Sequence, residues 1–175
     1  QPEGVYTFHR HEMVASFIFK PDATFEFFYS YGAADRTAAG TFTMAGDTVK
    51  LKSNKEAGKD FIIQQEASKG TTYSIVVTDK NNFLTQNVFA LAIIDGKEQI
   101  FESDKNGVIN IPVALCGKIY LQHGLFPDIY SLIKDDKNTN NYFEVTLSPS
   151  LAGVSFKGID LTLKDNTLSC PTNYF

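Results

Sequence analysis

The chain has 175 residues, a formal net charge of −4 and 13% aromatic residues, among them 15 Phe and 8 Tyr but no Trp. Its charged fraction of 21% is too low for a disordered chain, and this Phe and Tyr content favours β-strands. Lys and Arg form no basic footprint of the kind that nucleic acid or an anionic membrane requires, so we expect no nucleic-acid partner. No apolar run reaches the roughly 18–20 residues that cross a bilayer, and no transmembrane segment is predicted.

The start of the chain and its two cysteines bear on its compartment. The sequence begins at Gln1 without a Met, which a removed export signal explains, and a trimmed sequence explains it equally well. We expect an exported protein, which is periplasmic, on the cell surface or secreted. In such a compartment Cys116 and Cys170 can form one disulfide, but Cys116 lies in an apolar run and also suits a buried free thiol. Both alternatives stay open at this point.

The most regularly patterned stretch is Thr24–Ser53. Aromatic residues alternate with other residues in Thr24–Tyr31, which is the period of a strand with one apolar face. Two further alternating runs, 41–44 and 48–52, flank the Gly-containing turn Ala45–Asp47. The pattern predicts an antiparallel meander of three strands.

Two connections belong to this meander. Lys20–Thr24 contains Pro followed by Asp, which is turn chemistry, so a hairpin is predicted between the apolar run before it and the aromatic run after it. The small residues of Gly32–Gly40 predict a loop at one end of the sheet. Within the meander, this loop and the face that carries Glu26, Phe28 and Ser30 are the parts we expect to be available for function.

The rest of the chain is predicted to be β as well. A helix over 55–67 conflicts with Gly58 and with the missing 3.6-residue period, so a strand is favoured there. The small and polar residues of Ala67–Thr72 predict a linker, which divides the chain into modules 1–68 and 69–175. In the second module, six or seven short strands separated by turn signals predict a β-sandwich.

One family resemblance lies in the second module. The signature Ser103-Asp104-Lys105-Asn106-Gly107, followed by the alternating residues Val108, Ile109 and Ile111, resembles the transthyretin-like (prealbumin-like) domains of the carboxypeptidase regulatory type. It covers about 45 residues, with Ser103 in place of the family's usual Thr. The resemblance implies a seven-stranded sandwich that serves as an accessory or binding module of exported proteins, not as an enzyme.

A second resemblance lies in the first module. Pro21-Asp22-Ala23-Thr24-Phe25 and Gly40-Thr41-Phe42 are similar to the β-meanders that begin lipocalin-like proteins. The sequence does not provide eight consecutive strands for a closed barrel around a ligand, so a lipocalin function does not carry over. The fold class we predict is all-β: an N-terminal antiparallel meander packed with a C-terminal prealbumin-like β-sandwich.

His9 and His11 are the first candidate metal ligands. At strand spacing their side chains point to the same face, as two ligands on one strand must. A zinc site needs a third ligand, such as His123 or Glu12, and the sequence places neither nearby. A solvated sheet face explains the two histidines more simply, and we expect no metal there.

Two loops carry the oxygen-bearing side chains that calcium prefers. Glu102, Asp104 and Asn106 alternate before Gly107, but the closing bidentate Glu of a calcium loop is replaced by Val113. The second loop offers Asp135, Asp136, Asn138 and Asn140, again without a closing carboxylate. Because Asp and Asn are common in turns, we interpret both loops as turn chemistry and expect no cofactor.

No catalytic set is recognisable. Three histidines, no nucleophile-elbow motif and no glycine-rich phosphate loop leave no candidate catalytic residues. We therefore expect a non-catalytic binding or interaction module of the cell envelope or surface, with a protein or carbohydrate ligand. The alternative is a hydrolase or small-ligand-binding protein with its site between the two modules, built from carboxylates and tyrosines, or in a metal-dependent version from His9 and His11.

Overall fold

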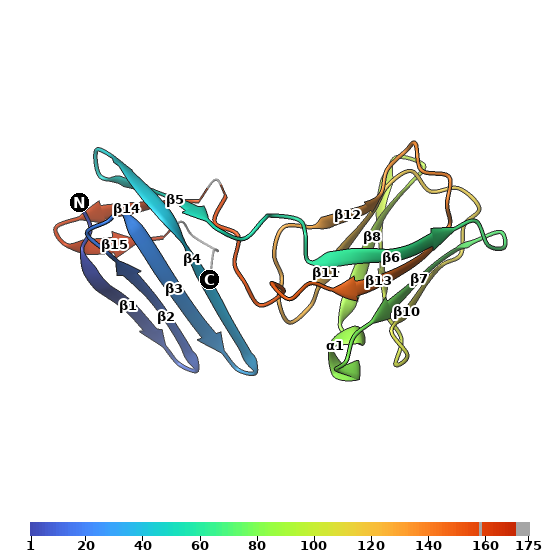
Figure 1. Cartoon of the computed structure of the whole chain (residues 1–175), viewed down its shortest axis with the longest axis horizontal. Helices are drawn as coiled ribbons and strands as arrows, with labels where there is room; N and C mark the ends of the chain where they lie inside the picture. The colour runs from blue at the N-terminus through green and yellow to red at the C-terminus, as the bar shows by residue number, and fades with distance from the viewer. Residues whose placement is uncertain (158, 171–175) are drawn as a thin grey trace. The chain divides into compact units, whose positions relative to one another are not determined.

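A computed structural model describes residues 1–157 and 159–170 of the chain, and it is all-β, as predicted. Its described part holds one helix, α1 (Asn82–Thr85), which is too short to cross a membrane. The chain forms two compact units (Figure 1). The first unit comprises residues 1–56 together with residues from 152 onward, and the second unit comprises residues 57–151.

The first unit is a single seven-stranded sheet in which every neighbouring pair of strands is antiparallel. In spatial order the strands are β1 (Gly4–Arg10), β2 (Met13–Phe19), β3 (Thr24–Tyr31), β4 (Ala34–Ala45), β5 (Thr48–Ser53), β14 (Asp160–Lys164) and β15 (Thr167–Ser169).

The predicted hairpin at Lys20–Thr24 is confirmed. The Ala23 amide donates to the Lys20 carbonyl (3.2 Å) and the Lys20 amide to the Thr24 carbonyl (2.9 Å). Ala23 has φ 63°, a left-handed conformation, and it occupies a position in the turn where Gly is usual. Asp22 compensates for this strain, because its Oδ1 accepts both from the Thr24 amide (3.1 Å) and from the Thr24 hydroxyl (2.6 Å).

The prediction of a loop at Gly32–Gly40 is wrong. The connection after β3 is a tight turn at Gly32 and Ala33, and β4 begins at Ala34 and pairs with β3 along its length. The small residues from Ala34 onward belong to β4, and packing requires one of them to be glycine. A Cβ atom on Gly40 would lie 2.0 Å from the Lys52 carbonyl oxygen, so only glycine fits there.

Aromatic rings fill the core of the first unit. The rings of Phe17 and Phe27 have centroids 4.7 Å apart, and Phe19 and Phe42 meet edge to face at 5.0 Å. Phe156 brings the returning chain into this cluster and contacts the rings of Phe17, Phe25 and Phe27. Such rings dominate the energetics of a core, so the aromatic alternation seen in the sequence accounts for the inner face of this sheet.

The second unit consists of two four-stranded sheets in a sandwich-like arrangement around one core. One sheet has the order β10 (Val108–Ile111), β7 (Tyr73–Thr78), β13 (Tyr142–Leu147), β6 (Phe61–Ala67). The other has the order β12 (Ser131–Lys134), β11 (Ile119–His123), β8 (Val88–Ile94), β9 (Lys97–Glu102). The strand favoured over a helix in 55–67 is confirmed for residues 61–67, which form β6.

Strand pairing explains why the units differ from the predicted modules, 1–68 and 69–175. β6 lies before the predicted boundary, but it pairs with β13 and so belongs to the second unit. β14 and β15 lie at the end of the chain, but β14 pairs with β5, where Leu161 faces Val49 and the Leu163 amide donates to the Asp47 carbonyl (2.8 Å). The second unit is therefore an insertion between two parts of the first.

Candidate functional site

The sheet of the first unit ends in two strands that each have a neighbour on one side only, β1 and β15. A cavity of about 720 Å³ lies between these two edges, and we call it the seam cavity. Such a volume lies within the usual range for small-molecule sites, about 300–1,000 Å³. β1 and β2 form one wall, and Leu161 with residues 166–170 forms the other.

The wall made by β1 and β2 is largely apolar. Strand alternation places Tyr6, Phe8 and Arg10 on the inner face of β1, where they stand opposite Phe17, Ala15 and Met13 of β2. Phe17 and Ala15 are buried, whereas Phe8 is 53% exposed, and all three line the cavity. An exposed phenylalanine at the mouth of an apolar cavity is a surface that a ligand can cover.

The opposite wall is built by the turn between β14 and β15. Asp165 and Asn166 both have positive φ, 48° and 59°, which is the two-residue hairpin turn that Asp and Asn tolerate. The Tyr6 hydroxyl donates to Asn166 Oδ1 across the seam (3.2 Å). This bridge joins two side chains, and β1 and β15 are not paired through their main chains. Leu168 and Cys170 continue the wall beyond the turn.

The seam cavity is lined mostly by apolar side chains. Among the described residues that line it, Arg10 is the single charged side chain, and none is Asp, Glu or His. Cys170 is a free thiol, and burial raises its pKa to about 11, so it stays protonated near neutral pH and is a poor nucleophile. The cavity therefore combines an apolar interior with one cationic group.

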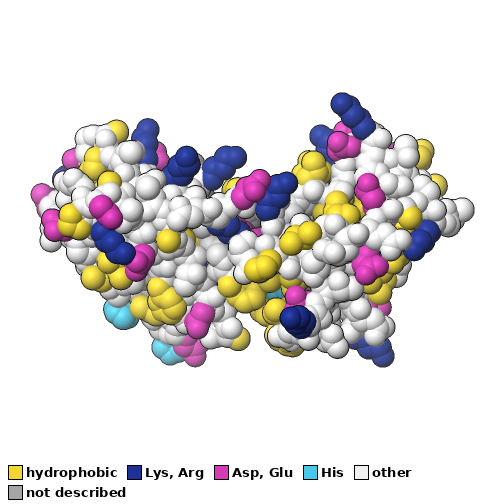
Figure 2. All heavy atoms as spheres, in the orientation of Figure 1, with side chains coloured by type: hydrophobic (Ala, Val, Ile, Leu, Met, Phe, Trp, Pro, Cys, Tyr) yellow, Lys and Arg dark blue, Asp and Glu magenta, His cyan; other side chains and the backbone are white. Residues whose placement is uncertain are grey.

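His9 and His11 do not share a strand. β1 ends at Arg10, so His9 is its penultimate residue and His11 lies in the turn to β2, next to Glu12 with φ 59°. The interpretation of two ligands on one strand face is corrected accordingly. Both side chains are exposed, and histidines are visible on the surface of the first unit in Figure 2. In the part of the chain that the structure describes, no three His, Cys, Asp or Glu side chains are grouped as a metal site requires.

The Glu102, Asp104 and Asn106 segment forms a turn. Asp104 Oδ1 accepts from the amides of Asn106 (2.8 Å) and Val108 (2.9 Å), and these hydrogen bonds, that of Val108 foremost, lower the pKa of its carboxyl. Its oxygen is thus engaged with the main chain. In the second oxygen-rich loop, Asp135 Oδ1 accepts in the same way from the amides of Lys137 and Asn138 (both 3.0 Å).

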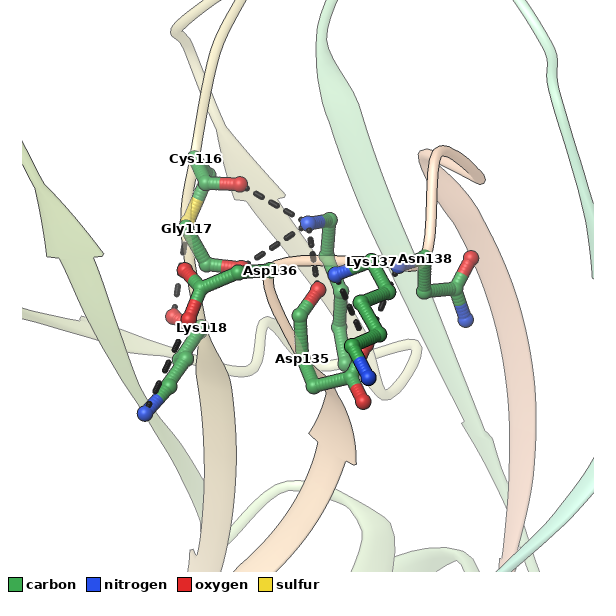
Figure 3. Close-up of polar contacts among 8 residues, drawn as sticks. Cys116, Gly117, Lys118, Asp135, Asp136, Lys137 and Asn138 are labelled. Carbon is green, nitrogen blue, oxygen red and sulfur yellow. Dashed lines mark hydrogen bonds and ion pairs between the residues drawn. The ribbon is translucent and has the colours of Figure 1, made fainter.

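A buried lysine beside this second loop was not noticed in the sequence. Lys134 is 3% exposed, and its ammonium donates to the carbonyls of Cys116 (2.8 Å), Gly117 (2.9 Å) and Asp135 (3.1 Å) (Figure 3). Figure 3 also shows the ion pair of Asp136 with Lys118, at 3.7 Å. Three carbonyl acceptors satisfy the ammonium fully, so Lys134 joins two loops and has a structural role.

The cysteine question is answered by the structure. Cys116 and Cys170 are both free, and they belong to different units. Cys116 is buried, its Sγ lies 3.5 Å from the carbonyl oxygens of both Ile93 and Lys118, and burial raises the pKa of its thiol. Such a thiol behaves as a small core residue.

The seam cavity is the site that sequence reasoning missed. Two local signals were available: the alternation of Tyr6, Phe8 and Arg10, and the Asp165-Asn166 dipeptide, which is typical of a hairpin turn. Neither signal shows that strands from opposite ends of the chain form two edges of the same sheet. Comparison with known proteins adds nothing here, since no family model, no curated protein and no solved structure matches the chain.

Proposed function

We propose that the protein is a non-catalytic binding module and that its first unit takes an elongated, largely apolar ligand in the seam cavity. The observation that carries this proposal is the cavity itself, about 720 Å³ between β1 and β15, with Phe8 and Tyr6 on its wall. Arg10 adds one cationic group, which suits a ligand with an anionic end. The absence of an acid, a base or an activated nucleophile among the described lining residues supports binding over catalysis.

A fluorescent fatty acid, dansyl-labelled undecanoic acid, tests this proposal by titration. Phe8→Glu places an acid on the cavity wall, and Phe28→Glu makes the same change on the outer face of β3, where Phe28 is 40% exposed. Burying a phenylalanine contributes about 1.5–3 kcal/mol, so we expect Phe8→Glu to weaken binding by roughly tenfold or more. Phe28→Glu should change the Kd by less than about twofold, since that side chain lies outside the seam.

Two outcomes would contradict the proposal. The first is that the natural sequence does not bind the probe saturably. The second is that the two variants weaken binding equally, which would place the probe on the surface at large. The same experiment therefore compares two candidate binding surfaces: the seam, through Phe8, and the outer face of the meander predicted from the sequence, through Phe28.

The finer identity of the second unit is part of the proposal. We infer that it is a prealbumin-like accessory sandwich, because its signature strand β10 lies beside β7 while the β8–β9 hairpin lies in the other sheet. We further propose a location in the cell envelope or on the surface, supported by the acidic balance of the chain. Detection of the protein in exported rather than cytoplasmic fractions tests that location.

A further inference from the structure

The main-chain groups of β1 alternate in direction. Its two-residue connection to β2, residues 11–12, places Arg10 opposite Met13, and residues that flank such a connection form a hydrogen-bonded pair. Bonded and non-bonded pairs alternate along an antiparallel ladder. The residues of β1 that point their N–H and C=O groups away from β2, toward the open edge, are therefore Val5, Thr7 and His9.

The pairing of β2 with β3 on its other side gives the same alternation of bonded and non-bonded residues independently. The Lys20 amide donates to the Thr24 carbonyl, which fixes a bonded pair at that end of β2 and β3. Counting back by alternation, β2 bonds to β3 through its even-numbered residues 14, 16 and 18. Its odd-numbered residues 13, 15 and 17 are left for β1, where they face Arg10, Phe8 and Tyr6.

The cavity reaches this unpaired main-chain edge. Val5 and Thr7 line the seam cavity although alternation turns their side chains to the outer face, where Val5 is 65% exposed. Val5 and Thr7 therefore line the cavity with their main-chain atoms. Within residues 1–157 and 159–170, no main-chain hydrogen bond links these groups to another strand.

β15 presents a matching edge from the other side. The turn at Asp165 and Asn166 makes Lys164 and Thr167 a bonded pair, so the next pair, Leu163 with Leu168, is non-bonded. The Leu163 amide donates to the Asp47 carbonyl on the β5 side, as expected for a residue of a non-bonded pair with β15. Leu168 thus directs its N–H and C=O into the seam.

The number of strands determines what can fill the gap. Seven strands that are antiparallel at every step leave the first and the last, β1 and β15, running in the same direction. One additional strand between them can run antiparallel to both, and this would close an eight-stranded barrel that is antiparallel throughout. Direct pairing of β1 with β15 would instead require a parallel pair.

From these observations we propose that the seam receives an extended segment of a partner protein, which adds the eighth strand between β1 and β15. The inference rests on the proposed function and names its ligand class. Edge strands with unpaired N–H and C=O groups are templates for such an addition, in which main-chain bonds supply affinity and alternate side chains supply specificity.

The walls of the cavity define the sequence of that segment. Every second side chain would face Tyr6, Phe8 and Phe17, so apolar residues are expected at alternate positions. Because the added strand runs antiparallel to β1, its N-terminal part lies beside Arg10 at the end of β1. An acidic residue at an inward position there would pair with this arginine.

A synthetic peptide library tests the proposal on the full chain. Its members match β1 in length and have threonine at outward positions, valine, leucine, isoleucine or phenylalanine at inward positions, and glutamate at the first inward position. Hydrogen exchange followed by NMR reads each amide separately. On binding, the exchange of the amides of Val5, Thr7, His9 and Leu168 should slow by roughly tenfold or more. The amides of Tyr6 and Phe8 are already bonded to β2, so their exchange should change less.

Two variants of one residue provide a matched control. Thr7→Pro removes the outward N–H, and Thr7→Val keeps it while removing the hydroxyl that bonds to Ser16 Oγ (2.7 Å). We expect Thr7→Pro to bind the selected peptide at least about tenfold more weakly than Thr7→Val, because only proline removes the main-chain donor. The hydrogen exchange of the buried Phe25 amide shows whether each variant is folded.

The outcomes separate this inference from the proposed function. If the dansyl fatty acid binds but no library member protects the four edge amides, the added strand is refuted and the apolar site stands. If neither binds, both proposals fail. If these amides become protected in the protein alone as its concentration rises, the occupant is a second copy of this chain and the partner proposal is overturned.

Discussion

Two buried polar side chains of the second unit, Lys134 and His123, have all their side-chain nitrogens hydrogen-bonded. The Lys134 ammonium donates to three carbonyls. His123 is fully buried, and its Nδ1 accepts from the Leu125 amide (3.2 Å). Its Nε2 therefore carries the proton and donates to the Leu84 carbonyl (2.9 Å). With both ring nitrogens engaged, His123 is a neutral core histidine rather than a third ligand for His9 and His11.

The burial of His123 predicts a pH dependence of stability. Burial lowers the pKa of His123 below its ordinary value of 6.5, so between the two pKa values the unfolded state binds more protons than the folded state. The contribution of this residue is fully present above about pH 6.5 and is lost as the pH falls, with a slope of at most about 1.4 kcal/mol per pH unit. Hydrogen exchange of the Leu121 amide between pH 5 and 7 measures it.

Substitutions identify the titrating group. His123→Gln should remove this slope, although it lowers stability at every pH. The double variant His9→Gln with His11→Gln should keep the slope, because both side chains are exposed. A slope that survives His123→Gln would assign the pH dependence to another group.

At the scale of elements, turn geometry is set by a few residues in left-handed conformations. Gly107 has φ 75° and lies between Asp104, whose carbonyl accepts from its amide, and β10. Its own carbonyl accepts from the Val77 amide (2.8 Å), which ties the turn to β7. The signature that suggested a prealbumin-like domain thus has a physical reason, because glycine allows this close approach of two main chains.

Gly107→Ala is predicted to destabilise the second unit by roughly 3 kcal/mol. The left-handed conformation costs about 1–2 kcal/mol for alanine, and a Cβ atom would lie 2.6 Å from the Val77 carbonyl oxygen, which forces the main chain to shift. Gly96→Ala in the β8–β9 turn is the control, since Gly96 has φ 74° but open space around it, and it should cost about 1 kcal/mol. Urea unfolding of both variants measures the difference, and equal losses would contradict the packing argument.

For the whole molecule, the sequence was sufficient for local structure and insufficient for pairing between distant segments. Alternation in Thr24–Tyr31 and the turn at Pro21-Asp22 predicted β3 and its hairpin, since both signals are local. The pairing of β5 with β14 joins residues that are more than a hundred positions apart, and no local pattern encodes it. The seam cavity depends on that pairing, which is why it was not predicted while the apolar face of the meander was.

The length of β4 shows a second limit. Ala34, Ala38 and Ala39 have low strand propensity, and together with glycines they suggested a loop. In the structure their neighbours on β3 supply the aromatic packing, and small residues opposite Phe25, Phe27 and Glu26 make room for it. Tertiary packing here overrides the local preference.

The proposed binding of an elongated, largely apolar ligand between β1 and β15 is the property on which the proposed strand addition depends. The most direct test is an NMR titration of the whole protein with dansyl-labelled undecanoic acid, in which every amide reports the position of the ligand. Binding in the seam should shift the amides of residues 5–10, 13–17 and 166–170, which lie on both walls. Shifts confined to the second unit, or spread evenly over the surface, would contradict it.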